Sequence, residues 1–157
     1  MQMNTPVTIL VGTTTGNAQY CAEEAQCRLS AAGIEAVVRP MDGLDASALA
    51  TPGVYLVVIS TYGQGDVPDN ARQLYESLIR DKPALDHVRF GLVSLGDTSH
   101  AQTFGFAGRR FETQLSKLGA SRIGDVLNHD ASSGIMPEEA TAAWLDAWLA
   151  ALGNATA

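Results

Sequence analysis

Short apolar runs alternate along the whole chain with longer segments in which apolar residues recur at helical spacing. The run from Val54 to Ile59 is almost unbroken, which is typical of a strand buried on both faces of a parallel sheet. Parallel strands need crossover connections, usually helices, that cover the sheet. The pattern therefore predicts an α/β fold with a doubly wound, five-stranded parallel sheet, helices on both faces, and strands at residues 7–11, 34–38, 54–59, 88–95 and 122–127.

The connecting segments predict four helices. The first spans residues 17–32 and stops at Gly33, and the second is capped by Asp69 or Asn70. The last opens at Pro137 with two acids behind it, as helix N-termini favour. Residues 41–51 read as a loop with one helical turn, and residues 153–157 as a fraying tail. The inward stripes are Ala18, Cys21, Ala22, Ala25, Leu29 and Ala32; Ala71, Leu74, Tyr75, Leu78 and Ile79; Phe106, Phe111, Leu115 and Leu118; and Ala140, Trp144, Leu145, Trp148 and Leu152.

Length and charge limit the classes of function. The 157 residues, numbered 1–157, fit a single domain without a linker or repeat. A formal net charge of -7 argues against nucleic-acid and anionic-membrane binding, which need a basic face, and favours basic protein partners. No secretory signal or membrane span is recognised, and the two cysteines, Cys21 and Cys27, lie on different faces of one predicted helix. We expect both thiols to be reduced, and hence a cytoplasmic protein.

Three unusual loops follow strands one, three and four, at the sheet edge where ligands of open α/β sheets bind. The first loop offers hydroxyls and a helix N-terminus but no Lys or Arg, so it differs from the nucleotide P-loop. It reads either as a monophosphate cradle or as an ordinary Thr-rich helix start. The residues of this candidate cradle are Thr13, Thr14, Thr15, Gly16, Asn17 and Ala18.

The other two loops suit a planar heterocycle. One places an aromatic face beside two glycines, and its candidate ligand residues are Ser60, Thr61, Tyr62, Gly63, Gln64 and Gly65. The other is long for a simple connection, and its candidates are Leu95, Gly96, Asp97, Thr98, His100, Thr103, Phe104 and Gly105. Each loop alone also reads as a polar turn or connection, but three together on one edge point to a binding site.

These stretches resemble the FMN-binding flavodoxin family. The likeness is carried by residues 13–18, 60–71 and 94–99, and it extends over essentially the whole chain. It is strongest to the FMN domains of sulfite reductase and cytochrome P450 reductase and to the short MioC-type flavodoxin-like proteins. The resemblance implies strand order 2-1-3-4-5 and a non-covalently bound FMN at the switch point.

The resemblance also implies a role for each loop. Residues 13–18 would hold the FMN phosphate, Tyr62 would stack on the ring, and the backbone near Gly63 would adjoin flavin N5. Residues 95–105 would hold the pyrimidine edge and the other face. Related domains usually carry a Tyr at the position of His100, so His100, Phe104 or solvent can fill the second stacking place.

The implied function is that of an electron carrier rather than an enzyme. It would be a monomer that takes electrons from a flavin reductase and passes them to a redox enzyme, both with basic faces. The alternative is a regulatory or partner-binding module on the same fold with weak or no FMN binding. A phosphoacceptor receiver would need acids where the chain has residues 12–14 and 60–62, and a free-standing protein is favoured over a piece of a diflavin reductase.

Several other residues invite a functional reading. Trp144 and Trp148 share a helix face and read as core. His129 and Asp130, after the fifth strand, read as loop polar groups or as groups that approach the flavin, and His87 reads as solvated. No metal-ligand spacing and no Gly-x-Ser-x-Gly motif is found.

Overall fold

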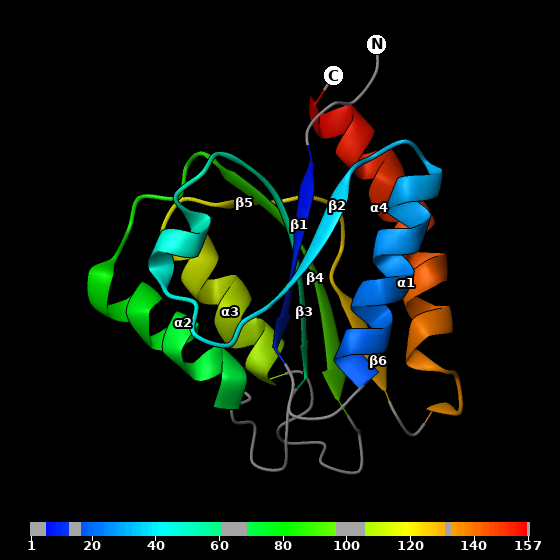
Figure 1. The fold of residues 1–157 in the computed structure, drawn as a ribbon, viewed down its shortest axis with the longest axis horizontal. Helices are drawn as coiled ribbons and strands as arrows, with labels where there is room; N and C mark the ends of the chain where they lie inside the picture. Colours follow the sequence, from blue (N-terminus) through cyan, green and yellow to red (C-terminus); the bar gives the residue numbers. More distant parts are fainter. Residues whose placement is uncertain (1–5, 13–16, 61–68, 97–105, 131–132, 157) are drawn as a thin grey trace.

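A computed structural model describes residues 6–12, 17–60, 69–96, 106–130 and 133–156. Figure 1 shows a parallel sheet between two layers of helices. Within these residues no helix has the length and apolar character needed to cross a membrane.

The sheet has the predicted strand order. All its strands pair in parallel in the order β2-β1-β3-β4-β5, and β6 also pairs with β4. The strands are β1 (Val7–Gly12), β2 (Ala36–Pro40), β3 (Gly53–Ser60), β4 (Val88–Gly96), β5 (Ser121–Arg122) and β6 (Leu127–Asp130).

Two helices cover each face of the sheet. On one face lie α1 (Asn17–Ala31) and α4 (Pro137–Thr156), and on the other lie α2 (Asp69–Asp81), α3 (Phe106–Lys117) and the 3-10 turn η1 (Ala46–Leu49). Alternate residues of β3 enter the two cores: Val54, Leu56 and Val58 face α1 and α4, and Tyr55, Val57 and Ile59 face the other layer. This double burial explains the apolar run that predicted the sheet.

The fifth strand differs from its prediction as one piece at residues 122–127. It is split into β5 and β6, because the pairing with β4 stops after Arg122 and resumes at Leu127, although the Ile123 amide still donates to the Phe90 carbonyl at 2.8 Å. Gly124 has φ +69°, a value that L side chains rarely adopt, and the indole nitrogen of Trp144 donates to the Asp125 carbonyl at 3.0 Å. The interruption is therefore held by α4.

The tryptophans of α4 belong to the core, as predicted. Trp148 is 1% exposed, and Trp144 is half-buried against the same cluster. Their rings stack with centroids 5.7 Å apart. Trp148 also lies on Gly91, where an added Cβ would come within 2.4 Å of its indole nitrogen.

The boundaries around β2 also differ from prediction. The strand starts at Ala36 rather than residue 34, because Gly33 turns the chain at φ +84° and the Ile34 amide donates back to the Leu29 carbonyl at 2.9 Å. Ala32 was predicted to face inward but is exposed beyond the end of α1. Ile34 is buried as the anchor of this turn.

Three further predictions were wrong. Ile79 is 44% exposed rather than inward, because it lies at the edge of the α2 stripe. His87 is half-buried rather than solvated, with Nε2 2.9 Å from the Leu49 carbonyl, so it fastens η1 to the start of β4. The helical backbone of α4 continues to Thr156, through most of the predicted frayed tail. The burial of His87 was not predicted because it depends on this contact with Leu49, which is distant in sequence.

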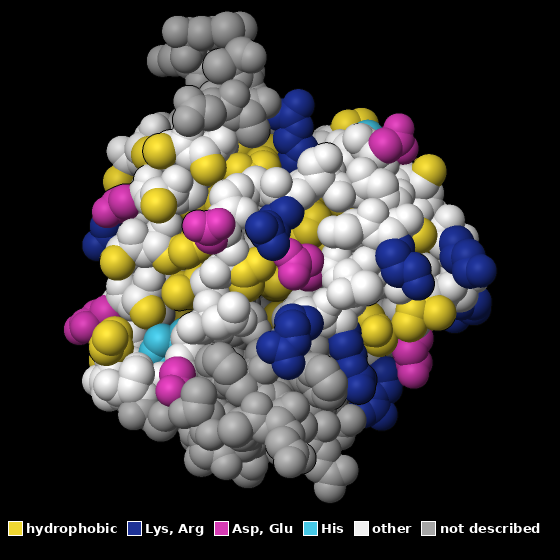
Figure 2. All heavy atoms as spheres, turned by 180° about the vertical axis from the view of Figure 1, so that it is seen from behind, with side chains coloured by type: hydrophobic (Ala, Val, Ile, Leu, Met, Phe, Trp, Pro, Cys, Tyr) yellow, Lys and Arg dark blue, Asp and Glu magenta, His cyan; other side chains and the backbone are white. Residues whose placement is uncertain are grey.

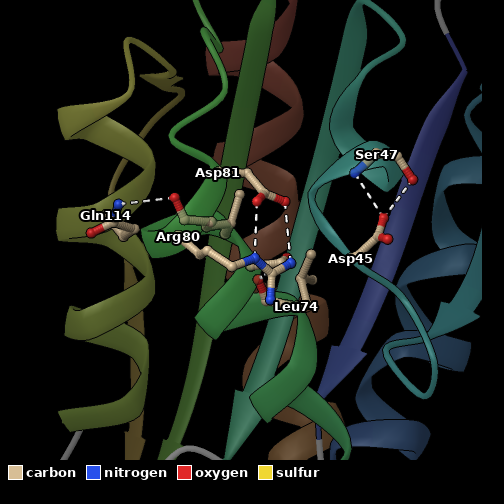
Figure 3. A network of polar contacts seen from close by, with 8 residues as sticks. Asp45, Ser47, Leu74, Arg80, Asp81 and Gln114 are labelled. Atoms are coloured by element: carbon tan, nitrogen blue, oxygen red, sulfur yellow. Dashed lines mark hydrogen bonds and ion pairs between the residues drawn. The ribbon is translucent and has the colours of Figure 1, made fainter.

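Figure 3 shows polar contacts within η1, within α2, and between α2 and α3. Asp45 caps η1 by accepting from the Ser47 amide at 2.9 Å and from the Ser47 hydroxyl, and these bonds hold the pKa of Asp45 below its ordinary value. Arg80 pairs with Asp81 at 2.9 Å. The Gln114 amide reaches the Leu78 carbonyl at 3.5 Å and so joins α3 to α2.

Candidate functional site

The strands that precede the three candidate loops end side by side. In the sheet register, Gly12 of β1 pairs with Ile59 of β3, and Ser60 pairs with Leu95 of β4. Because the strands are parallel, their carboxyl ends lie at one edge of the sheet, and the three loops start there. The fold thus supplies the convergence that the sequence pattern predicted.

Gly12 lies at the end of β1, where the surrounding side chains leave no room for a Cβ. An added Cβ would lie 2.9 Å from the Met41 sulfur and 3.0 Å from the Ala71 Cβ. The Asn70 amide reaches both the Val11 carbonyl and the Asp42 carboxylate at 3.4 Å, so the start of α2 is fastened to β1. Asn70 is the second residue of α2 rather than its cap. Gly12 opens the first candidate loop in the sequence and Asn70 belongs to the stretches that carry the family resemblance, but neither was predicted to bind the cofactor and these contacts were not predicted.

The N-terminal ends of α1 and α4 differ in charge. The first turn of α1 holds no acid, whereas that of α4 holds Glu138 and Glu139. A helix N-terminus carries a partial positive charge and unpaired amides that attract anions. The end of α1, which follows the first candidate loop, therefore carries no acid that would repel an anion such as the phosphate of FMN, and its unpaired amides fit such a group.

The predicted site residues fall into two groups. Of those described, Ala18 is fully buried in the first turn of α1, Ser60 is 6% exposed at the end of β3, and Leu95 is 5% exposed just before Gly96, the last residue of β4. Asn17 is the first residue of α1. The others lie outside the described residues: Thr13, Thr14, Thr15, Gly16, Thr61, Tyr62, Gly63, Gln64, Gly65, Asp97, Thr98, His100, Thr103, Phe104 and Gly105.

His129 and Asp130 belong to β6 and not to a loop, which corrects the predicted end of the fifth strand. His129 pairs with Leu95 in the sheet and is 5% exposed. Its Nε2 donates to the Ile135 carbonyl at 2.8 Å. The ring therefore anchors the start of the segment that leads into α4.

Cys21 links α1 to α4 below these helix ends. Burial raises the pKa of the Cys21 thiol to about 11, the Thr141 hydroxyl of α4 lowers it by hydrogen bonding, and the Glu138 carboxylate raises it. Cys27 is exposed, and both thiols are free, as predicted. The described residues contain no group of three His, Cys, Asp or Glu side chains placed to hold a metal ion.

Comparisons with known proteins agree with this architecture. The profile of the family described as Flavodoxin matches residues 9–144. The MioC protein of Escherichia coli K12 is 34% identical over 143 residues, which cover 91% of this chain and 95% of that protein. The sulfite reductase [NADPH] flavoprotein alpha-component of Bacillus subtilis is 36% identical over 150 residues, covering 95% of this chain but 24% of that longer protein.

A solved structure extends the likeness to three dimensions. A mutant of flavodoxin from Pseudomonas aeruginosa superposes with a TM-score of 0.83 at 38% identity, covering 94% of this chain and 99% of that one. The profile, the near full-length relatives and the strand order lead to one assignment. The chain belongs to the flavodoxin family, with FMN as its cofactor and electron transfer as its general function.

Proposed function

We propose that this protein is a single-domain, monomeric carrier that takes electrons from a flavin reductase and delivers them to a redox enzyme. The observation that carries the proposal is the meeting of three strand ends beside an α1 N-terminus without acids. This arrangement suits a flavin mononucleotide with its dianionic phosphate at the helix end. When bound, FMN accepts electrons from a donor and releases them to an acceptor.

The proposed roles of the loops follow from their chemistry. Hydroxyls and amides of residues 13–18 hold the phosphate, and Tyr62 stacks on one face of the ring. The backbone of residues 63–65 approaches the ring edge, since Gly63 and Gly65 bring no side chain that would block it. Residues 95–105 hold the remaining edge, with His100 or Phe104 as candidates for the second face.

The charge of the chain supports the choice of partners. A net charge of -7 draws oppositely charged surfaces together and speeds their encounter. We therefore assign basic-faced partner proteins as donor and acceptor. The rate of electron delivery to such a partner falls as salt is added, because salt screens charges that are exposed to water.

Single-turnover electron transfer tests this proposal. The FMN-loaded protein is reduced chemically without oxygen and mixed with cytochrome c, a basic electron acceptor, in a stopped-flow instrument. We expect acceptor reduction that requires both FMN and protein and slows with salt. Apoprotein that takes up no FMN, or loaded protein that reduces no acceptor, would favour the FMN-independent partner-binding module instead.

Substitution of Tyr62 tests its proposed contact with the ring. Tyr62→Ala is expected to weaken FMN binding by about 1 kcal/mol or more, roughly fivefold or greater in Kd, whereas Tyr62→Phe retains most of the affinity. Fluorescence quenching of added flavin measures both constants. Equal Kd values for the parent and Tyr62→Ala would remove Tyr62 from the site.

A further inference from the structure

An exposed groove lies between the N-terminal ends of α1 and α4. It has a volume of about 500 Å³ and is lined by Tyr20, Glu23, Glu24, Met136 and Glu138. Tyr20 is 58% exposed and Met136 55%, so its apolar parts face water. We call it the α1–α4 groove. Neither the proposed cofactor site nor the core uses these side chains.

Hydrogen bonds to the backbone of Ile135 and Met136 fix the segment that carries their exposed side chains. Ile135, 54% exposed, precedes Met136, and its carbonyl accepts the bond from buried His129. The Met136 carbonyl accepts from the amides of Glu139 and Ala140, both at 3.1 Å, at the start of α4. The other large apolar side chains exposed in the described part of the chain, Val37 on β2 and Ile79 on α2, lie on separate elements. The groove thus gathers an ordered apolar surface, which marks interaction sites.

Charge separates the two helical layers. Helices α1 and α4 together carry five acids and one base, whereas α2 and α3 carry four acids and five bases. Figure 2 shows Lys and Arg side chains gathered over the half that holds α2 and α3. Of the groove carboxylates, Glu24 pairs with Arg28 at 2.9 Å and Glu23 accepts from Gln19 at 3.1 Å, and the described lining contains no Lys or Arg. The groove is therefore apolar at its surface and anionic at its rim.

The groove also lies on the side of the molecule where electrons must leave. The N-terminal ends of α1 and α4 reach the sheet edge at which β1, β3 and β4 end (Figure 1). A protein seated in the groove would contact the surface beside the proposed FMN site. A surface at the opposite edge would hold a partner farther from it by the length of the strands.

We propose that the α1–α4 groove docks a cationic redox partner through a segment that presents Lys or Arg side chains around one apolar side chain. The apolar side chain contacts Tyr20 and Met136, and the cations face Glu23, Glu24 and Glu138. The complementary charges steer the encounter, and burial of the apolar contact prolongs the complex. This inference rests on the proposed electron-carrier function and gives it a docking surface.

Paired substitutions separate this groove from the overall charge of the protein. The groove pair Glu23→Gln with Glu138→Gln is compared with a control pair away from the groove, Glu76→Gln on α2 with Asp86→Asn in the turn before β4, which changes net charge equally. Both residues of the control pair are exposed. Each variant is first shown to bind FMN with the Kd of the parent. Cytochrome c is the probe, and isothermal titration gives its Kd while stopped-flow mixing gives the second-order rate of its reduction, both at low ionic strength.

We expect the groove pair to lower the rate about threefold or more and to raise the Kd for cytochrome c similarly, while the control pair changes either by less than about 1.5-fold. Tyr20→Ser is expected to raise the Kd at high salt, and its control Ile79→Ser is not. Equal effects of the two pairs, or none, overturn the docking proposal while electron transfer by the parent stands. A parent that binds FMN but reduces no cytochrome c overturns the proposed function itself.

Discussion

The N-terminal ends of α1 and α4 are neighbours in one helical layer, yet only the end of α4 carries acidic side chains. The first turn of α4 contains Glu138 and Glu139, which offset the partial positive charge of the helix end. The first turn of α1 contains no acid, and the Thr-rich loop of residues 13–16 precedes it. The partial positive charge of the α4 end is thus offset by acids of its own helix, whereas that of the α1 end is not.

We propose that the same backbone feature serves stability at the end of α4 and phosphate binding at the end of α1. It also places the acids of α4 beside the proposed phosphate site but on the rim of the α1–α4 groove, where Glu138 lies. The two helices also meet at Cys21 of α1, whose thiol hydrogen-bonds to the Thr141 hydroxyl of α4. Perturbing each end separately tests whether their roles differ.

The largest expected effect concerns Cys21 of α1, which is buried where α1 packs against α4. Burial raises the pKa of Cys21 from 9.0 to about 11. The folded state therefore keeps its proton where the unfolded state loses it, so this stability is fully present below pH 9 and is lost as pH rises through about 11. The full loss is about 3 kcal/mol, at about 1.4 kcal/mol for each of the two pKa units.

Urea denaturation at several pH values measures this loss. The fall in the free energy of unfolding between about pH 8 and pH 11 is expected to be smaller in Cys21→Ala than in the parent and unchanged in Cys27→Ala, whose thiol is exposed. The slopes, rather than the absolute stabilities, are compared, because the alanine also removes buried volume. If the slope in Cys21→Ala equalled that of the parent, burial between α1 and α4 would not be what keeps the thiol protonated.

A smaller effect is expected at the end of α4. Glu138→Gln with Glu139→Gln should lower the free energy of unfolding by about 1 kcal/mol at low salt, since each acid near a helix N-terminus contributes about 0.3–1 kcal/mol. Thermal or urea unfolding measures it, and added salt should reduce the difference. Asp146→Asn, an exposed acid in the middle of α4, is the control, and an equal loss there would show that the helix end has no special role.

The smallest effect is expected at the end of α1. Gln19→Glu places an acid in its first turn and should raise the Kd for FMN about two- to fivefold through repulsion of the phosphate, with the Kd for riboflavin unchanged. Flavin fluorescence titration gives both constants. Ser30→Glu, exposed at the other end of α1, adds the same charge and should leave both unchanged. If the Kd for riboflavin rises as much as the Kd for FMN, the substitution acts on the helix and not on the phosphate.

Most of the fold could be predicted from the sequence because local pattern and tertiary burial agree in it. The run from Val54 to Ile59 alternates between two cores, so its apolar character alone indicates a central strand. The break between β5 and β6 could not be predicted, because it depends on Trp144 reaching the Asp125 carbonyl from another element. His87 was misjudged for the same reason, since its partner is the distant Leu49 carbonyl.

The candidate site could be predicted as far as the strand ends that position it. Buried strands fix where Gly12, Ser60 and Gly96 lie, and the parallel order brings these ends to one edge. The contribution of Asn70 was missed because its partners lie on β1 and in the loop after β2. The α1–α4 groove was missed because Tyr20 and Met136 are far apart in sequence and meet only when the helices pack.

The proposed phosphate site at the end of α1 is tested most directly by comparing FMN with riboflavin, which differ only in the phosphate. Apoprotein is titrated into each flavin, and fluorescence quenching gives the two dissociation constants. If the acid-free end of α1 and residues 13–18 hold the phosphate, FMN binds at least about tenfold more tightly than riboflavin, since a charge-assisted bond to a dianion contributes about 1.5–3 kcal/mol. Equal dissociation constants would contradict the assignment of the phosphate to this helix end.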